Sequence, residues 1–214
     1  MNRRSYGQYC GTARALDIVG ERWTLLIVRD LLLGPRRYSE LLHGLPGITT
    51  NLLAKRLKEM EAAGLIERVR ANTSEASHSY RLTSLGLGLE PVVQALAAWG
   101  WHAMERAKSG EQRQLEWFFV ALRPRYRGGA TMRVELVADD VPYRVILDGS
   151  RAEISRGEVP APDVRLRGTS AALYRMFREP PPRGKAPTGI EVEGSVDAVR
   201  KLVNAFAVDE LTFS

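Results

Sequence analysis

The stretch LPGITTNLLAKRLKEMEAAGLIERVR (residues 45–70) places a Pro-Gly turn directly before a segment that opens with small, uncharged polar residues. Apolar residues recur at helical spacing behind this turn and predict a helix over residues 49–63 that Gly64 ends. The apolar face of that helix consists of Leu52, Leu53, Leu57 and Met60. The outward face consists of Thr50, Asn51, Ala54, Lys55 and Lys58. Taken alone, such an opening is also what ordinary N-capping by threonine produces.

A second short helix precedes this one and completes a helix-turn-helix outline. The segment YSELLHGL (38–45) predicts a helix with Ser39 as its N-cap, and Pro46-Gly47 forms the turn between the two. Further upstream, TARALDIVGERWTLLIVRDLLLG (12–34) predicts helices over about residues 13–19 and 22–33. The second of these is apolar almost all round, so we expect it at the centre of its domain.

A hairpin and a long helix are predicted downstream. LIERVR (65–70) and YRLT (80–83) have strand character, and the polar loop between them would form a wing with Arg68, Arg70 and Arg81 at its base. Thr83 or Ser84 can cap a helix over residues 84–107, with irregularities expected at Pro91 and Gly100. The apolar stripe of this helix exceeds what one small domain needs to cover, which indicates dimerisation.

The hydrophobic period changes after AKSGEQRQ (107–114). LEWFFVAL, TMRVELVA, PYRVILDG and RAEISRGE predict four strands, with a turn at Asp139-Asp140, and DVRLRG predicts a fifth. The amphipathic helix SAALYRMFREP follows, and after the strand GIEVEG comes a last helix, SVDAVRKLVNAF. The fold class is therefore α+β, with expected domains over residues 1–110 and 111–214.

Composition restricts the classes of function. The net charge is +6, with 15 Lys and Arg against 10 Asp and Glu through Gly110 and 16 against 15 thereafter, which favours a polyanionic partner for the N-terminal half. We expect a cytoplasmic protein, because no apolar run approaches the roughly 20 residues of a membrane span and MNRRSYGQYCG lacks the apolar core of a signal peptide. The single cysteine, Cys10, excludes an internal disulfide framework.

Catalysis is not indicated by any motif. The three histidines, His43, His78 and His102, are scattered, and neither a Ser/His/Asp arrangement, a metal-ligand spacing nor a Gly-rich phosphate loop occurs. We therefore expect no enzyme activity, no metal and no cofactor. The turn, the wing, the basic half and the long helix together predict a DNA-binding domain.

The chain resembles the winged helix-turn-helix transcriptional regulators of the HxlR type. The resemblance covers roughly residues 9–101 and is carried by RALDIVGERWTLLIVRDLLLGPRRYSELLHGLPGITTNLLAKRLKEMEAAGLIERV and by YRLTSLGLGLEPVVQALAAWG. It implies a bacterial homodimer on a pseudo-palindromic operator of double-stranded DNA, with the helix from Thr49 as recognition helix. It implies groove contacts by Thr49, Thr50, Asn51, Lys55 and Arg56, and backbone contacts by Arg36, Arg37, Arg70, Ser74 and His78.

In some members of this family a cysteine near the N-terminus, matched here by Cys10, senses oxidants or electrophiles. Here Gly11 follows it, where members often have proline. A sensing thiol needs a lowered pKa and access, and Arg3, Arg4 and Arg14 could supply positive potential. The alternative is a small apolar side chain packed in the dimer interface.

The C-terminal half resembles a sterol-carrier-protein-type (SCP2-like) domain, in which helices cover a twisted sheet and can enclose an apolar ligand. The resemblance rests on the order of elements and on the strand-Gly-helix joints at Arg167-Gly168 and Glu193-Gly194. It implies an apolar small-molecule effector. Candidate lining residues are Trp117, Phe119, Met132, Val134, Tyr143, Leu173, Met176 and Phe177. An ordinary core between sheet and helices would need the same residues.

Three hypotheses follow. The leading one is a dimeric regulator whose DNA affinity responds to an apolar effector. The second is a carrier of hydrophobic ligands in which the helical half serves only dimerisation. The third is a regulator in which the second domain binds nothing and only widens the dimer. A thiol-based, redox-sensing regulator that uses Cys10 is a separate alternative.

Overall fold

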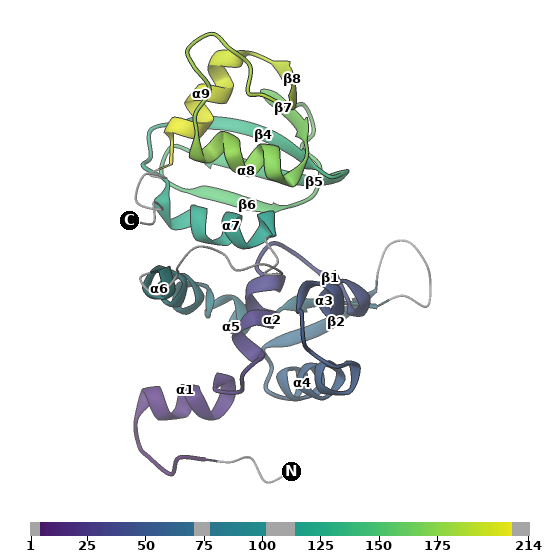
Figure 1. The fold of residues 1–214 in the computed structure, drawn as a ribbon. Coiled ribbons are helices and arrows are strands. Elements are labelled where there is room, and N and C mark those ends of the chain that lie inside the picture. Colours follow the sequence, from purple (N-terminus) through teal and green to yellow (C-terminus); the bar gives the residue numbers. More distant parts are fainter. Residues whose placement is uncertain (1–4, 71–77, 102–113, 207–214) are drawn as a thin grey trace. The chain divides into compact units, whose positions relative to one another are not determined.

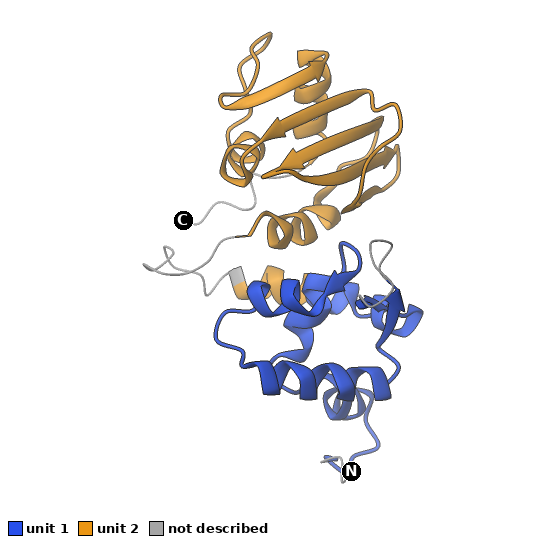
Figure 2. Ribbon diagram, turned by 90° about the vertical axis from the view of Figure 1, so that its right-hand side faces the viewer, with its two compact units in different colours: residues 1–93 blue, residues 94–214 orange. Residues whose placement is uncertain are grey.

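The computed structural model of the 214-residue chain describes residues 5–70, 78–101 and 114–206. The chain divides into two compact units, residues 1–93 and 94–214, coloured separately in Figure 2. This division falls within one helix, and the expected domain boundary at residues 110 and 111 lies outside the described residues, so it stays a prediction. Among the helices of the described part, none is long and apolar enough to cross a membrane.

The first unit is built around a buried central helix. Its helices are α1 (Gly11–Val19), α2 (Thr24–Leu31), α3 (Tyr38–Gly44), α4 (Thr50–Ala62) and α5 (Ser84–Leu87), and α6 (Glu90–Trp101) begins in it (Figure 1). Ile27 and Val28 of α2 are fully buried, which confirms the central position expected from its all-round apolar sequence. Gly47 has a φ of +85° in the turn before α4, a conformation that glycine adopts at little steric cost.

A three-stranded sheet completes this unit. Strands β2 (Ile66–Arg70) and β3 (His78–Leu82) form the predicted hairpin, with Ile66 opposite Leu82 and Arg70 opposite His78. The two-residue strand β1 (Arg36–Arg37) pairs with the other edge of β3, giving the order β1-β3-β2. The sequence did not predict β1, because two charged residues between helices carry no alternating pattern.

Two boundaries in this unit differ from expectation. Ser39 is not the N-cap of α3, because the helix already begins at Tyr38 after Arg37. The long helix predicted after Thr83 is interrupted at Gly88 rather than at Pro91. Pro91 lies in the first turn of α6, where its missing N–H would have had no helical partner.

The second unit contains a five-stranded sheet covered on one face by helices. The strands are β4 (Thr131–Ala138), β5 (Val141–Asp148), β6 (Ala152–Arg156), β7 (Val164–Gly168) and β8 (Ile190–Gly194), in the order β6-β5-β4-β7-β8. The helices are α7 (Leu115–Leu122), α8 (Ser170–Arg178) and α9 (Val196–Asn204), and α8 lies across the sheet in Figure 1. Neighbouring strands are antiparallel except β4 and β7, which run parallel.

LEWFFVAL forms the helix α7, so its prediction as a strand is wrong. Leu115, Phe118, Phe119 and Leu122 are all buried and follow helical spacing. The neighbouring Val120 and Ala121 are buried as well, so no polar face reveals the period of the run. Short apolar runs of this kind are ambiguous between helix and strand.

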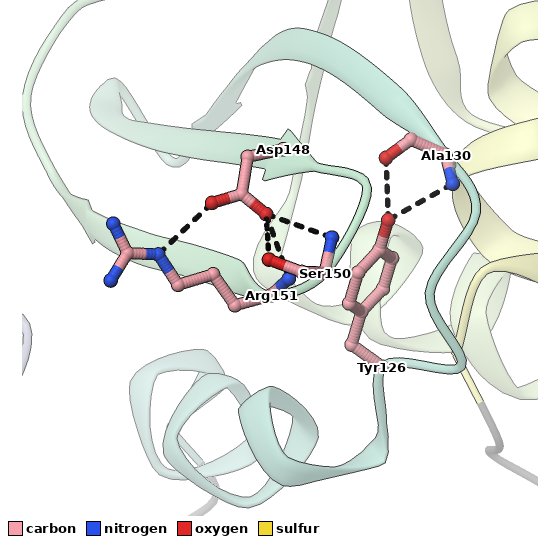
Figure 3. Close-up of polar contacts among 5 residues, drawn as sticks. All are labelled: Tyr126, Ala130, Asp148, Ser150 and Arg151. Atoms are coloured by element: carbon pink, nitrogen blue, oxygen red, sulfur yellow. Dashed lines mark hydrogen bonds and ion pairs between the residues drawn. The ribbon is translucent and has the colours of Figure 1, made fainter.

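The carboxylate of Asp148 accepts hydrogen bonds within the turn between β5 and β6, as Figure 3 shows. Asp148 Oδ1 accepts hydrogen bonds from the backbone N–H groups of Ser150 at 2.9 Å and Arg151 at 2.8 Å. These donors lower the pKa of the Asp148 carboxyl below its usual value, because they favour the ionised form. Figure 3 also shows Tyr126, whose hydroxyl accepts from the backbone N–H of Ala130 at 3.0 Å.

Candidate nucleic-acid interface

The exposed side of α4 carries the small polar and basic residues expected of a recognition helix. Thr49 is its N-cap, and the Thr49 hydroxyl accepts a hydrogen bond from the backbone N–H of Leu52 at 3.3 Å. The exposed residues of its first three turns are Thr50, Asn51, Ala54, Lys55 and Lys58. The side chains at the N-terminal end are short, so a partner can approach the helix closely there. Lys55 extends beyond them and lies 4.0 Å from Glu59.

The opposite side of α4 is packed into the unit, and it includes one predicted DNA contact. Leu53, Leu57 and Met60 are at most 2% exposed. Arg56 lies among them, since residues three and four apart share a helix face, and its side chain is only 8% exposed. It pairs with two carboxylates, Glu59 and Glu21, so the structure does not present Arg56 to a groove.

Arg36 and Arg37 lie on opposite sides of β1, because successive residues of a strand alternate in direction. Arg36 is 5% exposed, and its Nε donates to the backbone carbonyl of Asp30 at 2.8 Å. The Arg36 side chain is therefore buried, and the structure does not present it for the predicted phosphate contact. Arg37 is exposed, and its backbone N–H donates to the carboxylate of Glu40 at 2.7 Å.

The wing presents its basic residues on the two strands of the hairpin. Arg70 and His78 are opposite one another and exposed, as expected. Arg68 pairs with Glu61 at 3.3 Å, and Arg81 pairs with Glu67 at 2.8 Å. Ser74 lies outside the described residues.

Cys10 is an exposed free thiol directly before α1. Its pKa is lowered from its ordinary value, first by the backbone N–H of Ala13 and then by that of Thr12, which lie near the thiol and favour its ionised form. These donors belong to the first turn of α1, where backbone N–H groups lack helical partners and favour a negative charge. Arg3 and Arg4 lie outside the described residues.

Seven of the eight predicted ligand-lining residues lie in the core of the second unit, on strands β4 and β5 and helices α7 and α8, and are at most 5% exposed. Trp117 of α7 is half-buried. Phe119 and Tyr143 contact one another with ring centroids 5.2 Å apart. They fill the space between sheet and helices, which is the arrangement of an ordinary core. A pocket of about 250 Å³ lies between α8 and residues 179–188, and Met176 is the member of the eight that lines it.

The fold and this surface define the class of protein. A helix with an exposed polar N-terminal turn follows a second helix across a Pro-Gly turn, and a basic hairpin flanks them, which is the arrangement of a winged helix-turn-helix protein. A family model described as HxlR-like helix-turn-helix matches residues 18–108. The chain belongs to this family of transcriptional regulators.

Relatives of known sequence agree with this assignment. YkvN of Bacillus subtilis (strain 168), an uncharacterised HTH-type transcriptional regulator, is 36% identical over 103 residues, which are 48% of this chain and 87% of YkvN. Rv3095 of Mycobacterium tuberculosis, described in the same words, is 40% identical over 100 residues, which are 47% of this chain and 61% of that relative.

One similar solved structure is the reduced form of the transcriptional regulator YodB from B. subtilis. It is 32% identical, with a TM-score of 0.40, and the match covers 47% of this chain and 100% of that one.

Proposed function

We propose that this chain is a dimeric, non-enzymatic transcriptional regulator of the cytoplasm that binds a pseudo-palindromic operator. One observation carries the proposal: α4 buries its apolar side but exposes Thr50, Asn51 and Lys55 at its N-terminal end. In a major groove, such residues meet base edges and the phosphates beside them. Exposed Arg37 and Arg70 would add contacts to the phosphate backbone.

The test is fluorescence anisotropy of the full chain on labelled duplex DNA from upstream of its own gene and on a scrambled duplex, at several salt concentrations. A duplex selected by the protein from a random library serves as a second target. We expect tighter binding to the upstream or selected duplex. The absence of any preference, on selected DNA as well, would contradict the proposal and favour the carrier in which the helical half only dimerises.

The second unit is proposed to be SCP2-like and to bind an apolar effector that changes DNA affinity. The pocket beside α8 is the candidate site, and buried Met176 and Pro181 line it together with exposed Arg175 and Glu179. An effector can shift operator affinity only by binding one state of the protein more tightly, and about 1–3 kcal/mol of coupling is typical. Native mass spectrometry before and after organic extraction would reveal a copurifying ligand, and anisotropy of both samples would measure its effect.

Thiol-based regulation by Cys10 is a second candidate, supported by the exposure of the thiol and by its lowered pKa. The expected result is faster alkylation of Cys10 than of a free cysteine at neutral pH, and a change in DNA affinity after mild oxidation that Cys10→Ser abolishes. Unchanged DNA affinity after complete oxidation would contradict it.

A further inference from the structure

The turn between α1 and α2 is tied to the recognition helix by one hydrogen-bonded ion pair. A Glu21 carboxylate oxygen accepts a hydrogen bond from Arg56 Nη2 at 3.0 Å. Two residues later, the Trp23 ring lies near Gly47 of the turn that leads into α4, where an added Cβ would stand 4.0 Å from Trp23 Cη2. The segment from Glu21 to Trp23 therefore binds α4 two turns after its start and lies near the turn that precedes it.

The guanidinium of Arg56, which is almost fully buried, connects α4 to this turn by an ion pair. Its Nη1 donates to Glu59 of the next helical turn at 2.5 Å, while Nη2 reaches Glu21. Its Nε is buried and has no hydrogen-bond partner among the described residues. A buried cation is costly unless it is paired, so the position of Arg56 depends on both carboxylates. Glu59 shares its helix, which leaves Glu21 as the group that fixes Arg56 to another element.

We propose that Arg56 is a positioning residue which, through Glu21, fixes the recognition helix to the turn that ends α1, and thereby maintains sequence preference without touching DNA. The inference rests on the proposed DNA-binding function. It also connects the turn after α1 to the helix that carries the DNA-reading surface, through one hydrogen-bonded ion pair. The Arg56 guanidinium is too deeply buried to serve as the phosphate contact that sequence alone suggests.

Glu21→Ala is the decisive variant, because it removes the acceptor of Arg56 Nη2, and because the Glu21 side chain is 63% exposed its replacement leaves the core intact. The change removes one negative charge, so electrostatics alone would tighten binding to every DNA. Loss of the ion pair between Glu21 and Arg56 should instead weaken binding to the selected duplex. We expect the ratio of affinities for selected and scrambled DNA to fall by up to about fivefold, the size of one ion-pair interaction. The melting temperature should fall only slightly, because Glu59 still pairs with Arg56.

The matched control is Glu61→Ala, which removes the same charge from α4, where Glu61 forms an exposed pair with Arg68 of β2. It should leave the affinity ratio unchanged. In a double-mutant cycle, adding Glu21→Ala to Arg56→Gln should cause no further loss, because the pair is already absent. Thermal melts show whether Arg56→Gln folds, and Glu21→Ala decides the question if it does not.

Three results would overturn the inference. The first is a Glu21→Ala variant with wild-type discrimination, and the second is an additive loss in the double variant; both leave the proposed DNA-binding function standing. The third is a wild-type chain that selects no sequence from a random library, which overturns the proposed function and the inference with it.

Discussion

Asn51 is the residue whose side chain is best suited to reading a base. It is exposed in the first turn of α4, and its amide offers a donor and an acceptor that match the edge of adenine. Asn51→Ala should reduce the preference for the selected duplex by about 1–3 kcal/mol and leave affinity for scrambled DNA unchanged. Anisotropy titrations on both duplexes measure this. Equal weakening on both would contradict the assignment of α4 as recognition helix.

Arg37 should act on all DNA alike, since an exposed guanidinium beside a recognition helix contacts phosphate rather than bases. Arg37→Ala is expected to weaken binding to both duplexes by the same factor and to reduce the slope of log affinity against log salt by about 1. Titrations at four salt concentrations give the slope. An unchanged slope would exclude a phosphate contact at Arg37.

The neighbouring Arg36 should affect folding instead. Its buried Nε satisfies the backbone carbonyl of Asp30, so Arg36→Ala leaves a buried acceptor without this donor. The free energy of unfolding should fall by about 1–3 kcal/mol. Urea denaturation of the full chain measures the change, with Arg37→Ala as the exposed control on the adjacent position. Unchanged stability would show that Arg36 is dispensable to the fold.

Among the elements, the hairpin of β5 and β6 should make the second unit sensitive to acid. The pKa of Asp148 is lowered in the folded chain, so its ionised form stabilises the hairpin above the unfolded pKa of about 3.9, and this contribution is lost as the pH falls below that value. Asp148→Asn should therefore lower the melting temperature near pH 7, and the difference from wild type should shrink toward about pH 3.

The control for this experiment is Asp140→Asn, in the turn between β4 and β5. Asp140 has a positive φ of 64°, which asparagine tolerates well, and its carboxylate makes an exposed ion pair with Arg167 at 3.1 Å. Its replacement should change the melting temperature little at either pH. A pH-independent difference between Asp148→Asn and wild type would contradict the role given to the Asp148 carboxylate.

Periodicity predicted the elements whose two faces differ in polarity, and it failed where they do not. The helix α4 has a buried and an exposed side, and β5 buries every second residue from Tyr143 to Leu147. The run that forms α7 is buried nearly all round, and so it was predicted as a strand. The two-residue β1 forms only because β3 offers its edge.

Site residues show the same division. The exposure of Thr50, Asn51 and Lys55 could be predicted from the helical period. The burial of Arg56 and Arg36 was not predicted. Arg56 pairs with Glu21, which is 35 residues away in the sequence. Arg36 lies on the inward side of β1, a strand that the sequence did not predict. The helical spacing of α4 places Arg56 on the same face as Leu53 and Met60, and this spacing could have predicted its burial.

For the whole molecule, the exposed apolar stripe of α6 is the strongest indication of self-association. Val92, Leu96 and Trp99 lie on one helix face and are 44%, 48% and 72% exposed. Leu96→Glu should convert the proposed dimer into a monomer, since it places a charge in an apolar interface. Light scattering coupled to size-exclusion chromatography gives the mass. Ala98→Glu, exposed on another face of α6, is the control. A monomeric wild-type chain would contradict the dimer.

The parallel pair of β4 and β7 has a consequence for how the chain emerges during synthesis. β4 lies in the middle of its sheet only after β7 has been added, and the β5–β6 hairpin separates the two in sequence. Until residues 164–168 have left the ribosome, the growing chain carries β4 with one open edge, available for pairing with other chains. Residues 1–93 can complete their own core well before that moment. A nonsense codon shortly before residue 164 would thus yield a folded first unit attached to an aggregation-prone half-sheet.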